Sequence, residues 1–281
     1  MPIHDDLGLR MKTFYEQIPK TRLMRRVPAA IRIDGKAFHT LTRGFQKPFD
    51  EVLIKTMQET MKYLCENIQG CVLGYTQSDE ITLILIDYQK FTSQAWFDYE
   101  VQKMCSIAAS MATMAFNKYF RSYVNLFMED ATEYIKILIN AVEKGAMFDA
   151  RCFNIPKEEV CNLFYWRQLD AARNSIQMVG QANFSHKELQ NKSCSDIQDM
   201  LMTQKGINWN DFPTHQKRGS CCIKIEGNVT EETTVTESQF GEDEEKHVIN
   251  VERPHWIIDN EIPMFRGEGR DYIDKLIYVG E

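Results

Sequence analysis

The sequence predicts an α+β fold, and three observations point to it. Residues 27–153 follow the order strand, helix, strand, strand, helix, strand. The apolar residues of these segments recur either in short strand-like runs or at helical spacing. The chain has 281 residues, 43% hydrophobic and 26% charged, which is ordinary for a soluble globular protein. The order of elements is that of the ferredoxin-like, or split βαβ, motif.

The first elements are predicted from apolar runs and turn residues. Val27–Gly35 is expected to be a strand that ends in a small-residue turn. Phe49–Ile68 has apolar residues at helical spacing, and Gly70 follows its end. The runs "CVLGYT" and "ITLILI" predict two strands joined by a short polar turn.

Helices dominate the next part of the chain. Long helices are expected over about Trp96–Phe120 and Thr132–Lys144, followed by a strand over Ala146–Phe153. Pro156 suits the first turn of a further helix. We therefore expect residues 1–180 to form a catalytic domain.

Residues 181–281 are expected to form an extension that packs on that domain. Short helices are predicted near Ser185–Leu189 and Ser195–Gln204. The runs "SCCIKIE" and "HVINVERPHWII" predict a β-hairpin joined by an acidic segment, residues 226–246, which we expect to be a solvated loop.

Three acidic residues are predicted to converge. In a ferredoxin-like sheet the first and third strands are antiparallel neighbours. Asp34 closes the first strand, and Asp79 and Glu80 open the third. A solvated hairpin turn is the alternative explanation for the second pair. Converging carboxylates repel one another unless a cation compensates them, and oxygen ligands suit Mg²⁺. Acids placed in this way on such a sheet are typical of polymerase palm domains and nucleotide cyclases.

Charge is unevenly distributed along the chain. The net charge is −7, yet residues 10–47 carry ten Lys or Arg and two acids, a net of +8. Residues 226–246 carry eight acids and one Lys. The basic stretch predicts a polyanion-binding face, with RNA-binding candidates at Lys20, Arg22, Arg25 and Arg26.

The sequence also bears on location and cofactors. We find no run of eighteen apolar residues and no secretory signal at the start of the chain, so we expect a cytoplasmic protein without membrane contact. The eight cysteines include no C-x-x-C pair, which favours reduced thiols over a zinc site.

Two blocks carry a resemblance to a known family. The segments "RIDGKAFHTLTRGFQKPFD" and "GYTQSDEI" resemble the tRNA(His) guanylyltransferase family, including its guanylyltransferase-like branch of 3′–5′ reverse polymerases. The resemblance continues through "FDARCF", "YWRQLDAARNSIQMVGQANFSHKEL" and "GINWNDFPTHQKRG", and covers about residues 5–225.

The resemblance implies roles for individual residues. It implies that Asp34, the Gly35 carbonyl and Asp79 hold two Mg²⁺ ions, and that Glu80 supports this catalytic site. It implies ATP and GTP as substrates, and it implies that Phe38 can stack on a base. The implied nucleotide-binding residues are Arg32, Lys36, Ala37, Phe38, His39, Lys47, Asp50, Ser78, Lys103 and Asn174.

Departures from the usual family pattern favour the guanylyltransferase-like branch. The stretch "ARNSIQM" stands where enzymes that mature tRNA(His) have an "H-I-N-N-L-Y-N"-like run, and "DYEVQK" leaves Lys103 as the surviving basic residue of its cluster. The leading hypothesis is a template-dependent 3′–5′ nucleotidyltransferase that repairs truncated tRNA 5′ ends, assembled as a homotetramer. The alternatives are addition of a single 5′ guanosine to tRNA(His), a nucleotide cyclase, and a non-catalytic RNA-binding protein.

Overall fold

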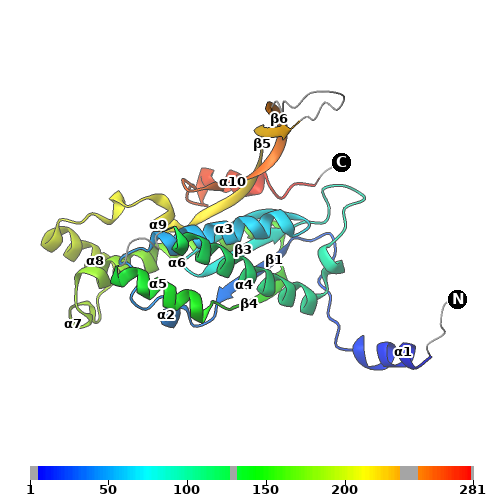
Figure 1. Cartoon of the computed structure of the whole chain (residues 1–281), viewed down its shortest axis with the longest axis horizontal. Helices are drawn as coiled ribbons and strands as arrows, with labels where there is room; N and C mark the ends of the chain where they lie inside the picture. Colours follow the sequence, from blue (N-terminus) through cyan, green and yellow to red (C-terminus); the bar gives the residue numbers. More distant parts are fainter. Residues whose placement is uncertain (1–5, 127–131, 235–245, 280–281) are drawn as a thin grey trace.

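The core of the protein is a six-stranded antiparallel sheet with helices on both faces (Figure 1). The computed structural model describes residues 6–126, 132–234 and 246–279. Strands run in the spatial order β4-β1-β3-β2-β5-β6. Their bounds are Ala29–Gly35 (β1), Cys71–Gln77 (β2), Glu80–Leu85 (β3), Phe148–Asn154 (β4), Ser220–Thr234 (β5) and Lys246–Asp259 (β6).

Helices fill the connections between these strands. The longer ones are α3 (Glu51–Asn67), α4 (Val101–Asn125), α5 (Glu133–Lys144) and α6 (Lys157–Asn183). The shorter α-helices are α1 (Asp6–Met11), α2 (Phe38–Leu41), α7 (His186–Leu189), α8 (Cys194–Met200), α9 (Thr214–Arg218) and α10 (Asp271–Asp274). Single turns of 3₁₀ or π type are η1 (Lys12–Glu16), η2 (Trp96–Tyr99), η3 (Leu201–Lys205), η4 (Trp209–Asp211) and η5 (Gly267–Arg270).

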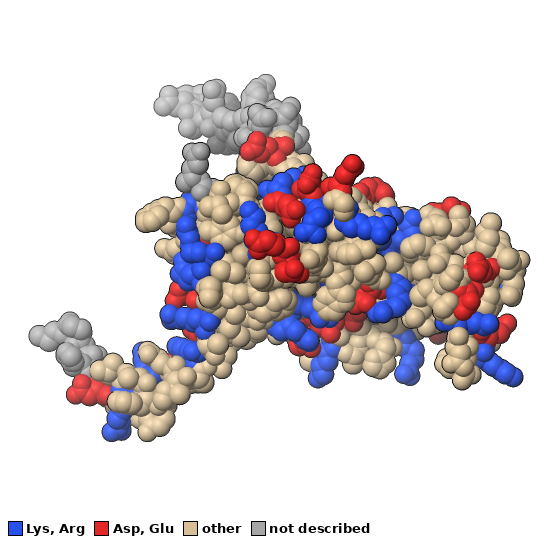
Figure 2. Space-filling view, turned by 180° about the vertical axis from the view of Figure 1, so that it is seen from behind, with Lys and Arg blue, Asp and Glu red and all other residues tan. Residues whose placement is uncertain are grey.

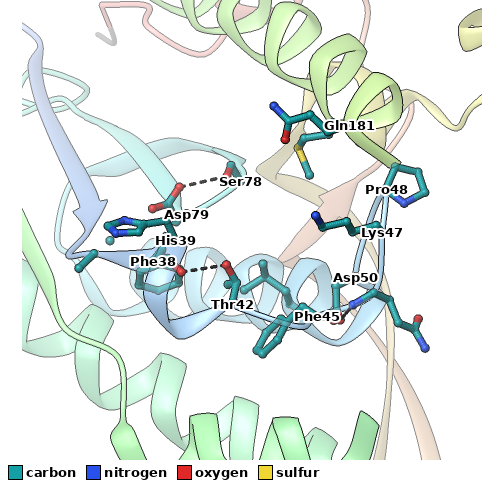
Figure 3. A pocket seen from close by; sticks show the side chains of 15 residues that line it. Phe38, His39, Thr42, Phe45, Lys47, Pro48, Asp50, Ser78, Asp79 and Gln181 are labelled. Atoms are coloured by element: carbon teal, nitrogen blue, oxygen red, sulfur yellow. Dashed lines mark hydrogen bonds between the residues drawn. The ribbon is translucent and has the colours of Figure 1, made fainter. Parts of the chain in front are cut away.

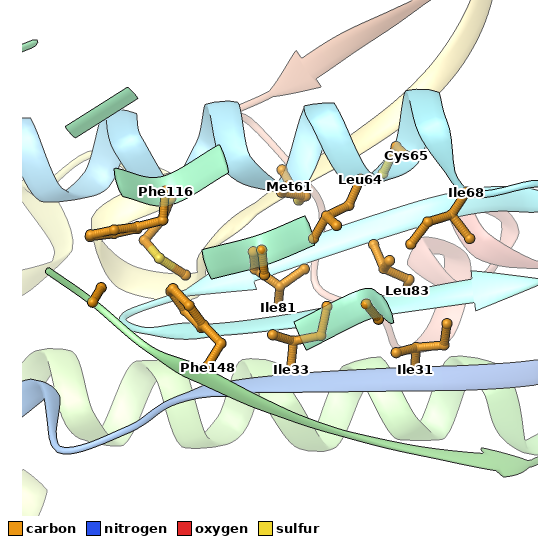
Figure 4. Packing of buried hydrophobic residues seen from close by; sticks show 14 of the residues in the cluster. Ile31, Ile33, Met61, Leu64, Cys65, Ile68, Ile81, Leu83, Phe116 and Phe148 are labelled. Atoms are coloured by element: carbon orange, nitrogen blue, oxygen red, sulfur yellow. The ribbon is translucent and has the colours of Figure 1, made fainter. Parts of the chain in front are cut away.

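Each face of the sheet has its own hydrophobic core. On one face, Ile31, Ile33, Ile81 and Leu83 pack against α3 and α4 (Figure 4). On the other face, strand residues such as Tyr75 pack against the first half of α6. The alternation of strand side chains between the two faces explains why neighbouring strand residues belong to different cores.

The predicted neighbourhood of the first and third strands is confirmed. β1 pairs antiparallel with β3 in a register that sets Asp34 opposite Glu80. β1 also pairs with β4, in a register that sets Asp34 opposite Asp149. The end of β1 therefore lies between two other strands, and its acidic residue has an acidic neighbour on each side.

The helix expected from Trp96 begins only at Val101. Phe97, Asp98 and Tyr99 have positive φ angles, which a right-handed helix does not allow. Trp96 and Tyr99 are both buried, three residues apart, and this spacing imitates helical periodicity in the sequence. The exposed turn between them directs Asp98 toward Arg22 and Arg25 instead.

The C-terminal part continues the sheet. Helix α6 passes through residue 180, where the domain boundary was expected, and β5 pairs directly with β2. The predicted hairpin is present as β5 and β6, which project from the body (Figure 1). The expectation of a loop over residues 226–246 is wrong for its two ends, because residues 226–234 and Lys246 belong to the strands. Residues 235–245 lie outside the described part of the chain.

Asp50 organises the start of α3. Its carboxylate accepts hydrogen bonds from the backbone N–H of Leu53 and of Gln46 and from the Tyr134 hydroxyl. Asp50 is the N-cap of the helix and is buried. The side chain thus ties α5 and the preceding loop to the first turn of α3.

We expect Asp50→Ala to lower the free energy of unfolding by about 2 kcal/mol, because it removes a helix cap and leaves the partly buried Tyr134 hydroxyl without this acceptor. Urea unfolding followed by circular dichroism measures this. Lys55→Ala, at an exposed position of the same helix, is the control and should change stability by less than about 0.5 kcal/mol. Equal stabilities of the two variants would contradict the capping role.

Candidate functional site: two carboxylates beside a cavity

Asp34 lies in a row of acidic residues across the sheet. Its cross-strand neighbours are Glu80 and Asp149. Cross-strand pairs project from the same face of a sheet, so the three side chains share one face. Partial burial, followed by the charges of Glu80 and Asp149, raises the pKa of Asp34. The fold therefore holds this carboxylate where its ionised form is unfavourable.

Asp79 is held beside Asp34 by a tight turn. Gln77 pairs with Glu80, so Ser78 and Asp79 alone make the turn between β2 and β3. The backbone oxygen of Asp79 accepts a hydrogen bond of 3.0 Å from the N–H of Gly35. Burial, together with the nearby charges of Asp34 and Glu80, raises the pKa of Asp79. Hydrogen bonds from the Ser78 side chain and the Asp79 backbone lower it, but the net change is upward. Asp34 thus lies close enough to Asp79 to disfavour ionisation of the Asp79 carboxyl.

Ser78 occupies a strained position in this turn. Its φ is +51°, a value that glycine adopts more readily than serine. The side chain donates a hydrogen bond of 3.0 Å to Asp79 Oδ1. Ala37, on the facing loop, also has a positive φ, of +54°. Strained non-glycine residues of this kind concentrate at functional sites.

Glu80 is enclosed by two guanidinium groups. Arg32 Nη2 lies 2.8 Å from Glu80 Oε2, and Arg167 Nη1 contacts both carboxylate oxygens at 3.0 and 2.9 Å. Arg167 also pairs with Asp170 and lies over the Trp166 ring. Glu80 is 7% exposed and Arg167 has a side chain 3% exposed, so these charges neutralise one another in the interior. Both oxygens of the Glu80 carboxylate are therefore already engaged by arginine side chains.

A cavity of about 460 Å³ opens next to Asp79 (Figure 3). It lies between the segment from β1 to α3, the β2–β3 turn and the second half of α6. This size is typical of small-molecule sites. The lining residues are Gly35, Ala37, Phe38, His39, Thr42, Phe45, Gln46, Lys47, Pro48, Asp50, Leu53, Ser78, Asp79, Met178 and Gln181.

Several residues predicted to bind nucleotide lie on this cavity. Ala37, His39, Lys47 and Ser78 line it, as do Phe38 and Asp50. Asn174 lines a smaller cavity of about 80 Å³, which also borders Ser78 and Met178. The structure thus brings together the β1–α2 loop, the β2–β3 turn and α6, as the quoted sequence blocks suggested.

The expectation that Phe38 stacks on a base is wrong. Phe38 is 5% exposed, and its ring packs against Phe116 at 5.4 Å and Phe148 at 5.2 Å between centroids. The same packing explains why residue 35 is a glycine, because a Cβ at this position would lie 2.3 Å from the Phe38 ring. Phe38 is a core residue whose edge forms part of the cavity wall.

Three other predicted nucleotide-binding residues do not line the cavity. Arg32 is engaged with Glu80, and Lys36 is exposed on the loop after β1. Lys103 lies near the start of α4, with its ammonium over the Phe97 ring. It is thirteen residues before Phe116, the α4 residue that touches Phe38, and this spacing places it roughly 20 Å along the helix.

The predicted RNA-binding residues are largely paired with acids. Arg22 and Arg25 contact Asp98, and Arg25 and Arg26 contact Asp87. Lys20 lies 3.6 Å from Glu16. The charge count of residues 10–47 overestimates their positive potential, because Asp87 and Asp98 lie outside that stretch. Figure 2 likewise shows Lys and Arg interspersed with Asp and Glu on the face it displays.

Sequence reasoning missed four residues of this region. Asp149 and Arg151, which form an ion pair of 2.9 Å, lie on β4 next to β1. Their spacing in "FDARCF" places both on the face of Asp34, and this was the available signal. Arg167 and Gln181 come from α6, and nothing in the local sequence connects them with Glu80 or with Lys47.

The donor set at the end of β1 fits a hard cation. Asp34 and Asp79 would supply carboxylate oxygens, the backbone of Gly35 would supply a carbonyl, and burial raises the pKa of both carboxyls, so a nearby cation would favour their ionised forms. Within the described residues no group of three or more His, Cys, Asp or Glu side chains could hold a metal. Two carboxylates completed by water and phosphate oxygens are a common arrangement for Mg²⁺.

Comparison with known proteins agrees with this geometry. A family model described as tRNAHis guanylyltransferase matches residues 9–156. A bacterial tRNA(His) guanylyltransferase (Thg1)-like protein in complex with ATP is 40% identical, with a TM-score of 0.77, over 98% of this chain and 100% of that chain. The corresponding GTP complex is 38% identical, with a TM-score of 0.72, over the same shares of the two chains.

Curated relatives extend the comparison. The tRNA(His) guanylyltransferase of Saccharomyces cerevisiae is 28% identical over 204 residues, which are 68% of this chain and 79% of that protein. An uncharacterized protein of Acanthamoeba polyphaga mimivirus is 30% identical over 235 residues, 77% of this chain and 76% of that one.

Fold, site and relatives define the class of enzyme. The protein is a nucleotidyltransferase. It belongs to the Thg1 family, the tRNA(His) guanylyltransferases, and the resemblance noted in the sequence is thereby confirmed. In the part of the chain that the structure describes, no helix is both long enough and apolar enough to span a membrane.

We expect Asp79→Asn and Asp34→Asn to stabilise the metal-free protein at pH 7. A carboxyl whose pKa is raised by folding opposes folding when ionised, so stability falls as pH rises from the ordinary Asp value through the raised one. The asparagine side chain of each variant carries no charge. The greater stability of the variants should vanish at acid pH, where the parent carboxyls are protonated. Thermal unfolding across pH measures it.

Magnesium should make the parent more stable than the Asp34→Asn and Asp79→Asn variants. Mg²⁺ should raise the melting temperature of the parent more than that of either variant, because only the parent retains both ligands. Asp199→Asn, at an exposed site on α8, should behave as the parent does. A parent that gains no stability from Mg²⁺ at any concentration would contradict the metal assignment.

Proposed function

We propose that this protein adds nucleotides in the 3′–5′ direction to the 5′ end of tRNA. The observation that carries the proposal is the proximity of Asp34 to Asp79, with Asp79 on the wall of a nucleotide-sized cavity. The solved bacterial relatives, which bind ATP and GTP, support nucleoside triphosphates as substrates here.

The reaction joins an incoming nucleotide to an activated RNA end. The 3′-hydroxyl oxygen of the nucleoside triphosphate attacks the phosphorus of the RNA 5′ phosphate. A new P–O bond forms, the bond to pyrophosphate or AMP breaks, and the hydroxyl proton is released. Lys47 lies on the cavity where it can bind phosphate, and the N–H groups and hydroxyl of the Ser78 turn can orient the substrate.

Asp34, Asp79 and the Gly35 carbonyl would hold two Mg²⁺ ions. When bound there, Mg²⁺ neutralises phosphate charge and lowers the pKa of the attacking hydroxyl. Glu80, clamped by Arg32 and Arg167, keeps the β2–β3 turn and therefore Asp79 in place.

The fold supports the same proposal. The sequence of elements together with the spatial order β4-β1-β3-β2 is that expected for a ferredoxin-like sheet, and we assign it to the palm class of polymerases. A homotetramer remains a prediction from the family resemblance. A cytoplasmic location and the division of the chain near residue 180 remain predictions from the sequence pattern.

Base pairing is the proposed means of selecting the nucleotide. The two phenylalanines that line the cavity, Phe38 and Phe45, are buried and pack on other rings, so neither offers a free face to a base. Selection would then come from the opposite strand of the acceptor stem, as repair of truncated tRNA requires. Addition of one guanosine to tRNA(His) is the second candidate, and the names of the curated relatives favour it.

Asp34→Ala and Asp79→Ala should each lower the rate of nucleotide addition by at least about 10³-fold, because loss of a metal ligand removes several kcal/mol of transition-state stabilisation. The assay is extension of a 5′-truncated tRNA transcript with nucleoside triphosphates and Mg²⁺, followed by sizing of the product. Asp199→Asn serves as the control. Near-parental turnover by either alanine variant would refute the assignment.

The identity of the added nucleotide should follow the opposing base. All four nucleoside triphosphates are offered to truncated tRNAs that differ only at the base opposite the growing 5′ end. The expected product restores a Watson–Crick pair in each case. Guanosine added regardless of the opposing base would favour the tRNA(His) guanylyltransferase activity instead.

A further inference from the structure

The basic N-terminal residues lie at the wrong end of the sheet to guide an RNA 5′ end to the carboxylates. Arg25 and Arg26 contact Asp87, just beyond the end of β3, whereas Glu80 begins that strand. β1 runs from Ala29 to its site end at Asp34, a span of roughly 17 Å at the usual rise of a strand. Arg25 is also ion-paired with Asp87 and Asp98, and the Arg26 guanidinium donates to the backbone oxygen of Asp87, so we sought an RNA-binding surface elsewhere.

A second cavity adjoins the first one. Its volume is about 570 Å³, and it lies between α6, α7 and the start of α8. Lys47 and Gln181 line both cavities. Figure 3 shows these two side chains on neighbouring parts of the cavity wall, Lys47 on the loop before α3 and Gln181 on α6. A ligand that fills the second cavity therefore reaches the first without leaving the protein surface.

The lining of the second cavity suits a polyanion. Lys47, Lys192 and His186 line it together with amide side chains such as Gln177 and Gln190, and its lining contains no Asp or Glu. The nearest helical acids are engaged in capping boxes. Glu188 accepts hydrogen bonds from the backbone and hydroxyl of Ser185, and Asp196 accepts the same pair from Ser193.

The cavity is built on a packed base. Phe184, Leu189 and Ile197 line it and also belong to a separate hydrophobic cluster with Ile176 and Val179 of α6. The ammonium of Lys205 lies 5.3 Å from the centre of the Phe184 ring, so a further positive charge stands beside the lining. The apolar base of the cavity is therefore packed against α6, which also borders the first cavity.

We propose that this second cavity binds the phosphodiester backbone of the RNA strand that leads to the 5′ end. The inference rests on the proposed function, since it places the polymer part of the substrate whose end reacts at Asp34 and Asp79. Lys192 and Lys47 would contact phosphates, and the amide groups would contact sugars or phosphates. Lys192 is specific to the second cavity, so its substitution separates RNA binding from nucleotide binding.

The test uses a 5′-truncated tRNA transcript labelled at its 3′ end, with fluorescence anisotropy measured over a range of salt concentrations and without nucleotide. Lys192→Glu should raise the Kd for RNA at least fivefold. Lys192→Gln should lower the magnitude of the slope of log affinity against log salt by about 1, because one phosphate contact is lost. The matched control is Lys118→Glu, an exposed lysine of α4 that lines neither cavity, and it should change the Kd less than twofold.

The phosphate groups bound in the second cavity could belong to the RNA backbone or to a nucleotide. Affinity for GTP, measured by calorimetry, distinguishes these two ligands. Lys192→Glu should leave it unchanged. If GTP affinity falls while RNA affinity does not, the cavity holds a nucleotide and the proposal is overturned. It is also overturned if Lys192→Glu binds RNA as the parent does, or if Arg25→Gln weakens RNA binding more than Lys192→Glu. A parent that binds RNA through Lys192 but adds no nucleotide would instead refute the proposed function and leave the RNA site intact.

Discussion

The buried ion pairs of Glu80 are the interaction on which the site depends. Glu80 is the first residue of β3, and its carboxylate is fixed by Arg32 from the neighbouring strand and by Arg167 from the helix that covers the sheet. Removal of one partner from such a group leaves an uncompensated charge in the interior, which costs far more than a surface pair is worth. The turn with Ser78 and Asp79 is therefore held at its end by the fixed side chain of Glu80. Asp79 consequently has little freedom to move away from Asp34.

This rigidity works against the stability of the isolated protein. Asp34 and Asp79 are both partly out of water, and burial is the main reason that the pKa of each is raised; neighbouring acids add to it, Glu80 and Asp149 for Asp34, and Asp34 and Glu80 for Asp79. Left free, two such side chains would separate into solvent. The surrounding β-sheet and its two hydrophobic cores supply the free energy that keeps them together, so the arrangement is prepared for a positively charged ligand before that ligand binds.

The sequence predicted what depends on strand order and missed what depends on long-range packing. The position of Asp34 opposite Glu80 followed from the order of strands and helices and from the acids at the strand ends. The burial of Phe38 did not, because its helix has only four residues and its partners Phe116 and Phe148 lie on distant elements. The net positive charge of the N-terminal stretch was overestimated for a similar reason, since Asp87 and Asp98 pair with Arg22 and Arg25 from outside the stretch. A linear count of charge cannot include partners that only folding brings near.

The length of α6 sets a spacing within the molecule. A single uninterrupted helix carries Arg167, which anchors Glu80, and Gln181, which borders both cavities. Fourteen residues separate them, roughly 21 Å along the axis. The helix thus fixes the distance between Arg167 and Gln181. A one-residue insertion between them would turn the far end of the helix by about 100° relative to the carboxylates.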